Sequence, residues 1–354
     1  MRRSRPPLLL PLALALAVLA AACSGEASTR ADASEEGPTT TAAPVRAPET
    51  IPDGVTLRVG DQLDYLKTVL ELAGEDQGYG YDVEYASFVG GPPMLQAFQG
   101  DAIDIGFVGS TPLIFAQAAG QDIRAVAGWA SAEASFYGLV TAPGVDDVAG
   151  WDDVRGKRIA YQRGTAGEAV LLQSLDEAGI ELGEITPVDV SQLQVAATLQ
   201  GGGADLGISI EPLTSAYLTA NEGAEQVARA DRITDRSSFL IATEGTLADE
   251  GRSAALADYL SRLVRAFGYL RENEQAVVDG VFTEVYGLSP ERAAELQVEN
   301  GETSFYPIPD DELVEAQQHL ADLFVEAGQI PEEVDVTAQF DNRFNDLVAE
   351  EQGS

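Results

Sequence analysis

Residues 103–120 read Ile103-Asp-Ile-Gly-Phe-Val-Gly-Ser-Thr-Pro112-Leu-Ile-Phe-Ala-Gln-Ala-Ala-Gly120. The first six residues are mostly branched or aromatic, which is typical of a strand, and the part after Pro112 is typical of a helix that stops at a glycine. Thr111 suits the N-cap, and Pro112 suits the first helical position because proline has no N–H to leave unpaired there. The stretch therefore predicts a strand, a tight turn and a helix.

The same strand-and-helix alternation extends in both directions along the chain and predicts an α/β fold. The expected strands span residues 55–59, 81–85, 103–108, 125–129, 138–141, 158–161, 186–190, 206–210 and 239–242. The expected helices span residues 64–73, 93–99, 112–119, 166–178, 193–200, 212–219, 253–273, 274–286, 289–299 and 310–326.

A weak internal repeat indicates two similar halves. Residues 98–106 contain Gly100 and then Asp104-Ile-Gly, and residues 199–207 contain glycines and then Asp205-Leu-Gly. In each copy a helix stops at glycine, a strand follows, and a helix starts near a proline. The match is short enough to arise by chance, so by itself it leaves the number of lobes open.

Three strand-to-helix junctions are candidate binding sites: residues 109–112, residues 162–168 and Glu211-Pro212. Ligands of open α/β sheets bind beyond the carboxyl ends of the strands. Thr165 and Glu168 have the spacing of a capping box. The unpaired N–H groups of two such helix starts can hold an anionic group without Lys or Arg. The alternative is that each junction is only a well-formed helix start.

The N-terminus has the pattern of an export signal. Arg2, Arg3 and Arg5 precede an apolar run over residues 8–22, and Leu19-Ala-Ala-Ala-Cys23 resembles a bacterial lipobox. We expect a signal peptide at 1–22, lipidation of Cys23 and a Ser/Thr/Pro-rich tether over residues 23–50. The alternative is an ordinary signal peptide with a chance cysteine. Cys23 is the only cysteine, so the fold has no disulfide.

Composition excludes several classes of function. The chain has 58 acidic and 21 basic residues and a formal net charge of −37, which argues against a nucleic-acid partner. The acidic residues are dispersed, as expected of a solvated surface. The single histidine, His319, has no evident partner for Cys–His or Ser–His chemistry, and no calcium-loop spacing appears. We therefore expect no enzyme activity, no cofactor and no metal.

The segment Gly91-Pro-Pro-Met-Leu95 together with residues 103–120 closely resembles the signature region of aliphatic-sulfonate, taurine and nitrate-type substrate-binding proteins of ABC importers. Residues 154–165 resemble the same family's entry to the second lobe, and the resemblance covers about residues 55–225. It implies a bilobal type II periplasmic-binding fold, in which two mixed or parallel sheets flanked by helices close over a ligand about a hinge. Lobe I would comprise residues 51–147 and 235–350, and lobe II residues 148–234.

The resemblance also implies a set of residues that line the cleft: Gln62, Gly109, Ser110, Thr111, Gln162, Gly164 and Thr165. Trp129 would add a wall, although the residues alone allow it to be a core plug. Close sulfonate binders have Trp-Asp-Pro where this chain has Ile210-Glu211-Pro212. The missing Trp removes a flat surface and Glu211 adds a carboxylate, which favours a zwitterion, an amine-bearing solute or a heterocycle over a simple alkanesulfonate.

The expected protein is thus a monomeric solute-binding lipoprotein at the outer face of the cytoplasmic membrane. It would touch the membrane only through its lipid and would deliver a small anionic or zwitterionic solute to an ABC permease and ATPase. The alternatives are a surface lipoprotein or sensor feeder that binds a different solute, such as an amine or a pyrimidine, or a protein that binds another protein.

Overall fold

The computed structural model describes residues 44–46, 50–131, 136–229 and 237–353. The predicted signal peptide, Cys23 and most of the predicted tether lie outside these residues. Within the described part of the chain, no helix combines the length and the apolar character needed to cross a membrane.

Six strands form a mixed sheet, sheet A, in the order β11-β4-β10-β3-β1-β2. Its strands are β1 (Thr56–Gln62), β2 (Asp82–Phe88), β3 (Ile105–Gly109), β4 (Ile123–Ser131), β10 (Ser237–Thr243) and β11 (Thr303–Tyr306). Strand β1 pairs in parallel with β2 and β3, whereas β10 is antiparallel to β3 and β4. The chain therefore leaves sheet A after β4 and returns to its middle through β10.

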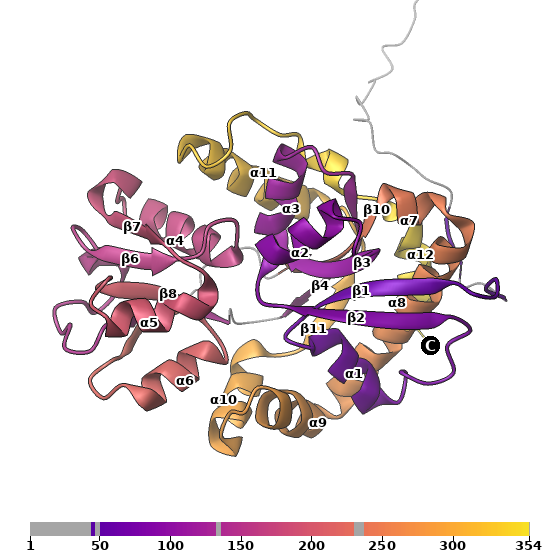
Figure 1. Ribbon diagram of the computed structural model, residues 1–354, viewed down its shortest axis with the longest axis horizontal. Helices are drawn as coiled ribbons and strands as arrows, with labels where there is room; N and C mark the ends of the chain where they lie inside the picture. The colour runs from indigo at the N-terminus through magenta and orange to yellow at the C-terminus, as the bar shows by residue number, and fades with distance from the viewer. Residues whose placement is uncertain (1–43, 47–49, 132–135, 230–236, 354) are drawn as a thin grey trace, which may run out of the picture. The chain divides into compact units, whose positions relative to one another are not determined.

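Five further strands form sheet B, in the order β7-β6-β8-β5-β9. They are β5 (Tyr137–Thr141), β6 (Arg158–Tyr161), β7 (Thr186–Asp189), β8 (Leu206–Ile210) and β9 (Gln226–Arg229). Strand β6 is parallel to β7 and β8, and β5 is antiparallel to β8 and β9. Figure 1 shows β6, β7 and β8 on the left and the strands of sheet A on the right.

Helices cover both faces of each sheet (Figure 1). The helices are α1 (Tyr65–Ala73), α2 (Gly91–Gln99), α3 (Ser110–Ala118), α4 (Ala166–Glu177), α5 (Val195–Gln200), α6 (Leu213–Ala220), α7 (Glu244–Ala248), α8 (Glu250–Glu272), α9 (Glu274–Ala276), α10 (Pro290–Asn300), α11 (Asp311–Glu326) and α12 (Asn345–Gln352). A π-helical segment spans Val277–Val285, and short 3₁₀ turns span Trp151–Asp153, Leu182–Glu184, Gln192–Gln194, Val336–Gln339 and Asn342–Phe344.

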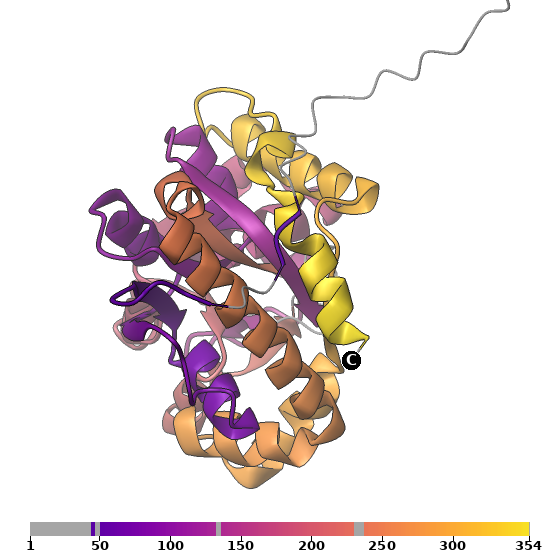
Figure 2. The ribbon, with the colours of Figure 1, turned by 90° about the vertical axis from the view of Figure 1, so that its right-hand side faces the viewer.

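Alternating side chains of sheet A supply two separate cores, because successive residues of a strand point to opposite faces. Leu240 and Ala242 of β10 pack with α1 and α8, whereas Phe239 and Ile241 pack with α2 and α3. Figure 2 shows α8, in orange, and α12, in yellow, running side by side. Sheet B has its own cores, one with α4 and one with α5 and α6.

The two copies of the internal repeat form equivalent Arg–Asp ion pairs, one in each sheet. In sheet A, Asp104 accepts hydrogen bonds from the backbone N–H of Arg58 at 2.8 Å and from its Nη2 at 2.6 Å. In sheet B, Asp205 accepts the same two bonds from Arg158 at 2.8 and 2.7 Å. Arg58 lies in β1, and Asp104 directly precedes β3, the parallel neighbour of β1. Arg158 lies in β6, and Asp205 directly precedes β8, the parallel neighbour of β6.

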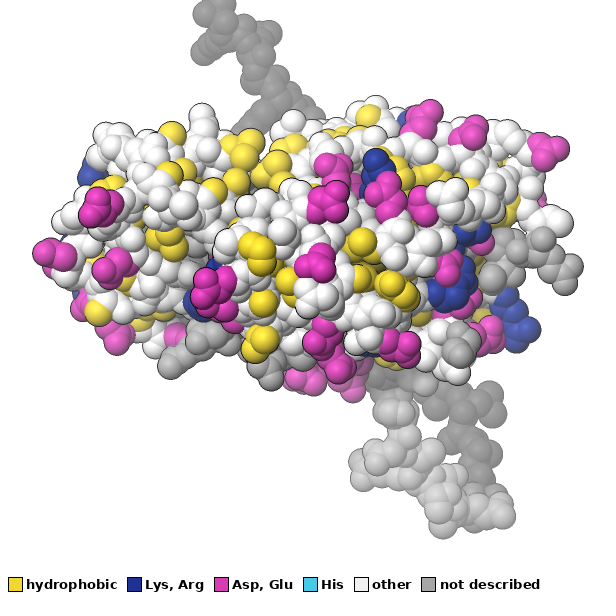
Figure 3. All heavy atoms as spheres, turned by 90° about the horizontal axis from the view of Figure 1, so that it is seen from below, with side chains coloured by type: hydrophobic (Ala, Val, Ile, Leu, Met, Phe, Trp, Pro, Cys, Tyr) yellow, Lys and Arg dark blue, Asp and Glu magenta, His cyan; other side chains and the backbone are white. Residues whose placement is uncertain are grey.

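The surface agrees with a dispersed negative charge. Figure 3 shows Asp and Glu side chains scattered over one face among other residues, with only a few Lys and Arg side chains. No single acidic patch dominates that view, so the acidic side chains form a dispersed, solvent-exposed negative charge.

The structure differs from the sequence-based expectations in several places. Strands β9 and β11 and helices α7 and α12 were not predicted, and the expected helix over residues 274–286 is π-helical after Ala276. Strand β5 falls in the segment assigned to lobe I but pairs with β8 and β9 of sheet B. Antiparallel pairing between strands about 70 residues apart leaves no local pattern by which it could be recognised.

We predict that Asp104→Asn lowers the free energy of unfolding by about 3 kcal/mol, because a buried carboxylate with two cationic partners is replaced by a neutral amide. Burial disfavours ionisation of Asp104, yet hydrogen bonds from Arg58 and Arg252 outweigh it and keep the pKa of Asp104 below its usual value. Urea unfolding would measure the change.

The matched control is Asp101→Asn. The Asp101 side chain is 88% exposed and meets the same Arg58 at 3.2 Å, so its removal should leave stability nearly unchanged. Equal losses in the two variants would contradict the assignment of the buried pair.

Candidate functional site

A cavity of about 210 Å³ lies between elements of sheet A and elements of sheet B. From the sheet A side, Gln62 is the last residue of β1, Gly109 and Thr111 lie at the start of α3, and Trp129 belongs to β4. From the sheet B side, Thr165 and Ala166 begin α4, and Glu211 follows β8. The cavity thus lies at the carboxyl ends of parallel strands in both sheets, where α/β folds bind ligands.

Six of the nine expected site residues line this cavity: Gln62, Gly109, Thr111, Trp129, Thr165 and Glu211. The other three, Ser110, Gln162 and Gly164, are neighbours that do not line it. Gln62 is also held by sheet A, since its Nε2 donates to the carbonyl oxygen of Phe107 at 2.8 Å.

Helix α3 begins earlier than predicted. Gly109, in extended conformation, is the N-cap, and the helix starts at Ser110, so the prediction of Thr111 as N-cap is wrong. Thr111 instead lies in the first turn, 1% exposed, and its Oγ1 has no hydrogen-bond partner among the described residues. A buried, unpaired hydroxyl beside a cavity is suited to meet a polar group of a ligand.

Helix α4 has Thr165 as its N-cap, as predicted, but it lacks the expected capping box. The Thr165 hydroxyl donates to the carbonyl oxygen of Gln162 at 2.7 Å. Glu168 accepts from the backbone N–H of Gly164 at 2.7 Å, one residue before the position that a capping box would use. Gly164 has φ of 69°, which favours glycine and allows this tight approach.

Gln162 and Gly164 therefore shape the turn rather than the cavity wall. The side-chain oxygen of Gln162 accepts from the backbone N–H of Gln192 at 2.9 Å, which holds the loop against the rest of sheet B. Ser110 is 1% exposed, and its carbonyl oxygen accepts from Gln317 of α11 at 3.2 Å. These contacts hold the starts of α3 and α4 in place without taking part in the cavity wall.

Glu211 is 5% exposed and its charge is compensated. Its Oε1 lies 3.0 Å from Nη2 of Arg292 in α10, and its Oε2 accepts from the backbone N–H of Ser215 at 3.2 Å. Arg292 also pairs with Glu299 at 2.9 Å, and Glu299 in turn pairs with Arg229 of β9. The carboxylate thus faces a cation, which is the condition under which it does not repel an anionic ligand.

Aromatic side chains provide much of the cavity wall. Those that line it are Tyr65, Phe107, Trp129, Phe136, Tyr137 and Tyr286. Trp129 is 4% exposed, and its ring lies 5.8 Å from that of Phe107 and 5.4 Å from that of Phe305 between centroids. Trp129 is therefore both a core residue and part of the wall, so the two alternatives considered from the sequence both hold.

No Lys or Arg is among the described residues that line this cavity. Hydrogen-bond donors must then come from backbone N–H groups at the starts of α3 and α4 and from neutral side chains. Such an arrangement can hold an anionic or polar head group by the helix dipole and by short hydrogen bonds. The aromatic walls can enclose an apolar part of the same ligand.

Two mixed sheets that share a cleft at their strand ends define a protein of the periplasmic-binding class. The model of the NMT1/THI5-like family matches residues 76–267, and the chain belongs to this family.

Several similar proteins are named as solute-binding proteins of this class. A putative aliphatic sulfonates-binding protein of Escherichia coli is 28% identical over 256 residues, which cover 72% of this chain and 77% of that protein. A protein of the same name from Bacillus subtilis is 26% identical and covers 78% and 81%. The alkanesulfonate-binding protein of Xanthomonas axonopodis, solved with MOPS bound, superposes with a TM-score of 0.72 at 26% identity over 82% of this chain and 99% of that one.

We predict that Glu168→Gln changes how stability depends on pH. Burial raises the pKa of Glu168 to about 7. A raised pKa means that the group's stabilising contribution is present below the unfolded value of 4.5 and is lost as pH rises through about 7. Relative to the variant, the free energy of unfolding of the wild type should therefore fall by about 2–3 kcal/mol between about pH 5 and about pH 8.

Urea unfolding at both pH values checks this difference. Glu326→Gln, which removes one exposed carboxylate from the end of α11, controls for the change in net charge. A constant difference between the wild type and Glu168→Gln across this range would contradict the burial argument.

Proposed function

We propose that this chain is an extracytoplasmic solute-binding protein of an ABC importer that captures a small sulfonate or a similar anionic or zwitterionic solute. Its named relatives bind aliphatic sulfonates or are named for that role, and its fold places a cavity between two sheets. In this proposal, the halves built on sheet A and sheet B act as two lobes that close about a hinge.

The observation that carries the proposal is the convergence of two helix starts on one cavity. The start of α3 contributes its N-cap Gly109 and Thr111, and the start of α4 contributes its N-cap Thr165 and Ala166. Each start offers unpaired N–H groups and a partial positive charge, which suits a sulfonate oxygen. The buried, unpaired hydroxyl of Thr111 adds a donor at the same place.

The Glu211–Arg292 pair bears on the choice of solute. With both of its oxygens engaged, Glu211 neither repels an anion strongly nor requires an amine. The departure from Trp-Asp-Pro therefore leaves a sulfonate acceptable, and the aromatic walls favour one with an apolar body.

The proposal includes the expected placement of the protein. The sequence pattern at residues 1–23 supports export and lipidation of Cys23, and the segment up to residue 50 would tether the folded part to the membrane. A monomer in this position would hand its solute to the permease and ATPase of the importer and would itself catalyse no reaction.

We predict that Thr111→Val weakens binding of an alkanesulfonate by about tenfold or more, because one hydrogen bond to a charged group is lost. Titration calorimetry with butanesulfonate would measure the affinity, and circular dichroism would check the fold.

Thr214→Val is the matched control. The Thr214 hydroxyl is likewise buried and without a partner among the described residues, but Thr214 does not line the cavity. The control should bind as the wild type does. Equal affinity in Thr111→Val and the wild type would place the head group elsewhere.

We predict that Cys23→Ala abolishes lipid attachment while leaving the export signal intact. Expression in a bacterial host with a radiolabelled fatty acid should label the wild type and not the variant. The variant should move from the membrane fraction to the soluble exported fraction. A variant that stays membrane-bound would show that Cys23 is not the anchor.

A further inference from the structure

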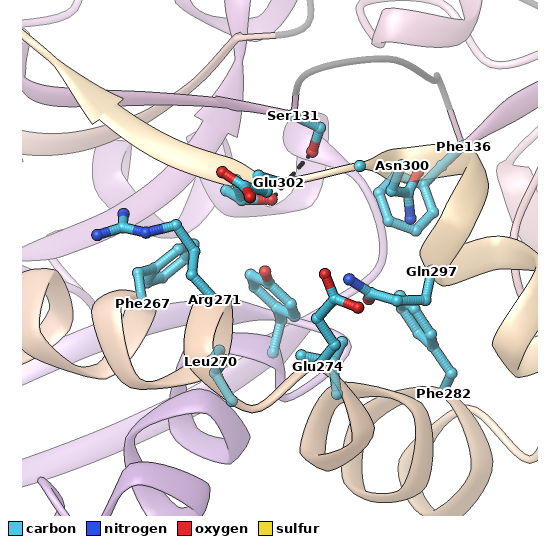
Figure 4. Close-up of a pocket in the computed structure, with 14 residues that line it drawn as sticks. Ser131, Phe136, Phe267, Leu270, Arg271, Glu274, Phe282, Gln297, Asn300 and Glu302 are labelled. Carbon is cyan, nitrogen blue, oxygen red and sulfur yellow. Dashed lines mark hydrogen bonds between the residues drawn. The ribbon is translucent and has the colours of Figure 1, made fainter.

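A side chamber of about 60 Å³ adjoins the main cavity. Four residues line both: Tyr65, Ser131, Phe136 and Thr303. The chamber extends from this shared wall between the end of α8, α9, the π-helical segment and the end of α10, as Figure 4 shows. It lies outside the set of site residues expected from the sequence.

Aromatic rings form much of the wall of the side chamber. Phe267 of α8 and Phe282 of the π-helical segment line it together with Tyr65 and Phe136. The rings of Tyr65 and Phe267 meet edge to face with centroids 6.1 Å apart, and those of Phe136 and Phe282 with centroids 6.4 Å apart. Aromatic faces of this kind attract cations through the negative potential of their π systems.

Oxygen atoms complete the side chamber. Asn300 is 4% exposed, and its buried Oδ1 has no hydrogen-bond partner among the described residues. In Figure 4 the carboxylate of Glu274 points into the chamber beside Gln297, whereas the guanidinium of Arg271 points away from it. Glu302 adds a second carboxylate to the lining.

These groups select for a hydrogen-bond donor that carries positive charge. A buried amide oxygen without a partner costs free energy, which a ligand N–H would recover. Two exposed glutamates alone would be an ordinary solvated surface. The unpaired Asn300 oxygen and the aromatic walls distinguish this chamber from such a surface.

We propose that the side chamber receives the amino end of an elongated zwitterionic solute whose anionic end lies at the starts of α3 and α4. The inference rests on the proposed function, because that proposal supplies the position of the anionic end of the solute. It adds a length requirement: the solute must extend from the main cavity past the shared wall of Tyr65 and Phe136. A short amino sulfonate fills only the main cavity.

The test compares ω-aminoalkanesulfonates with alkanesulfonates of equal chain length by titration calorimetry on the mature protein. For short chains the two series should bind alike. Beyond a threshold length the amine should bind about tenfold more tightly, the scale of a cation held by aromatic rings and carboxylates. Glu274→Gln and Asn300→Leu should each reduce this preference while leaving the affinity for a short alkanesulfonate unchanged.

Glu272→Gln is the control, since it removes an exposed carboxylate two residues before Glu274 that does not line the chamber. It should keep the preference for the amine.

If alkanesulfonates bind but no amine preference appears at any length, the side-chamber proposal is overturned and the proposed function stands. If neither series binds, both are overturned. A preference that survives Glu274→Gln and Asn300→Leu alike would place the amine elsewhere and would also overturn the side-chamber proposal.

Discussion

The site depends on one constraint: in both sheets a parallel strand ends at the same cavity and leads, directly or through a short turn, into a helix. Unpaired N–H groups of α3 and α4 therefore collect at one place without any Lys or Arg among the described lining residues. At the opposite end of these strands, the Arg58–Asp104 and Arg158–Asp205 pairs hold neighbouring strands in register. The alignment of each strand end with its helix start follows from that register.

Local sequence signals were sufficient for most of the fold. Strand β6 begins and ends where the pattern predicted, and most other elements differ by only a few residues, because branched runs bounded by Gly and Pro are strong signals. The edge strands β9 and β11, at Gln226–Arg229 and Thr303–Tyr306, were missed, as were the helices α7 and α12. Sheet membership of β5 depends on long-range pairing, which no local pattern encodes.

The candidate site was predictable only where its residues belong to a strand-to-helix junction. Thr111, Thr165 and Glu211 were found because glycine, hydroxyl and proline residues mark such junctions. Arg292 and Asn300 come from α10, roughly 80 residues beyond Glu211, and nothing in their local sequence links them to a cavity. Two further points depend on three-dimensional packing and could not be read from the local sequence. They are that Trp129 lines the cavity and that Thr111 lies in the first turn of α3.

The chain of ion pairs from Glu211 through Arg292 and Glu299 to Arg229 begins and ends on sheet B but passes through α10. If the proposed opening of the lobes separates sheet B from α10, it would break both ends of this chain. The residence time of the solute would then depend partly on charges that do not line the cavity. Because Glu211 and Arg292 are largely buried, dissolved ions screen their pair only weakly, so the retention of the cargo would depend little on the ionic strength of the surroundings.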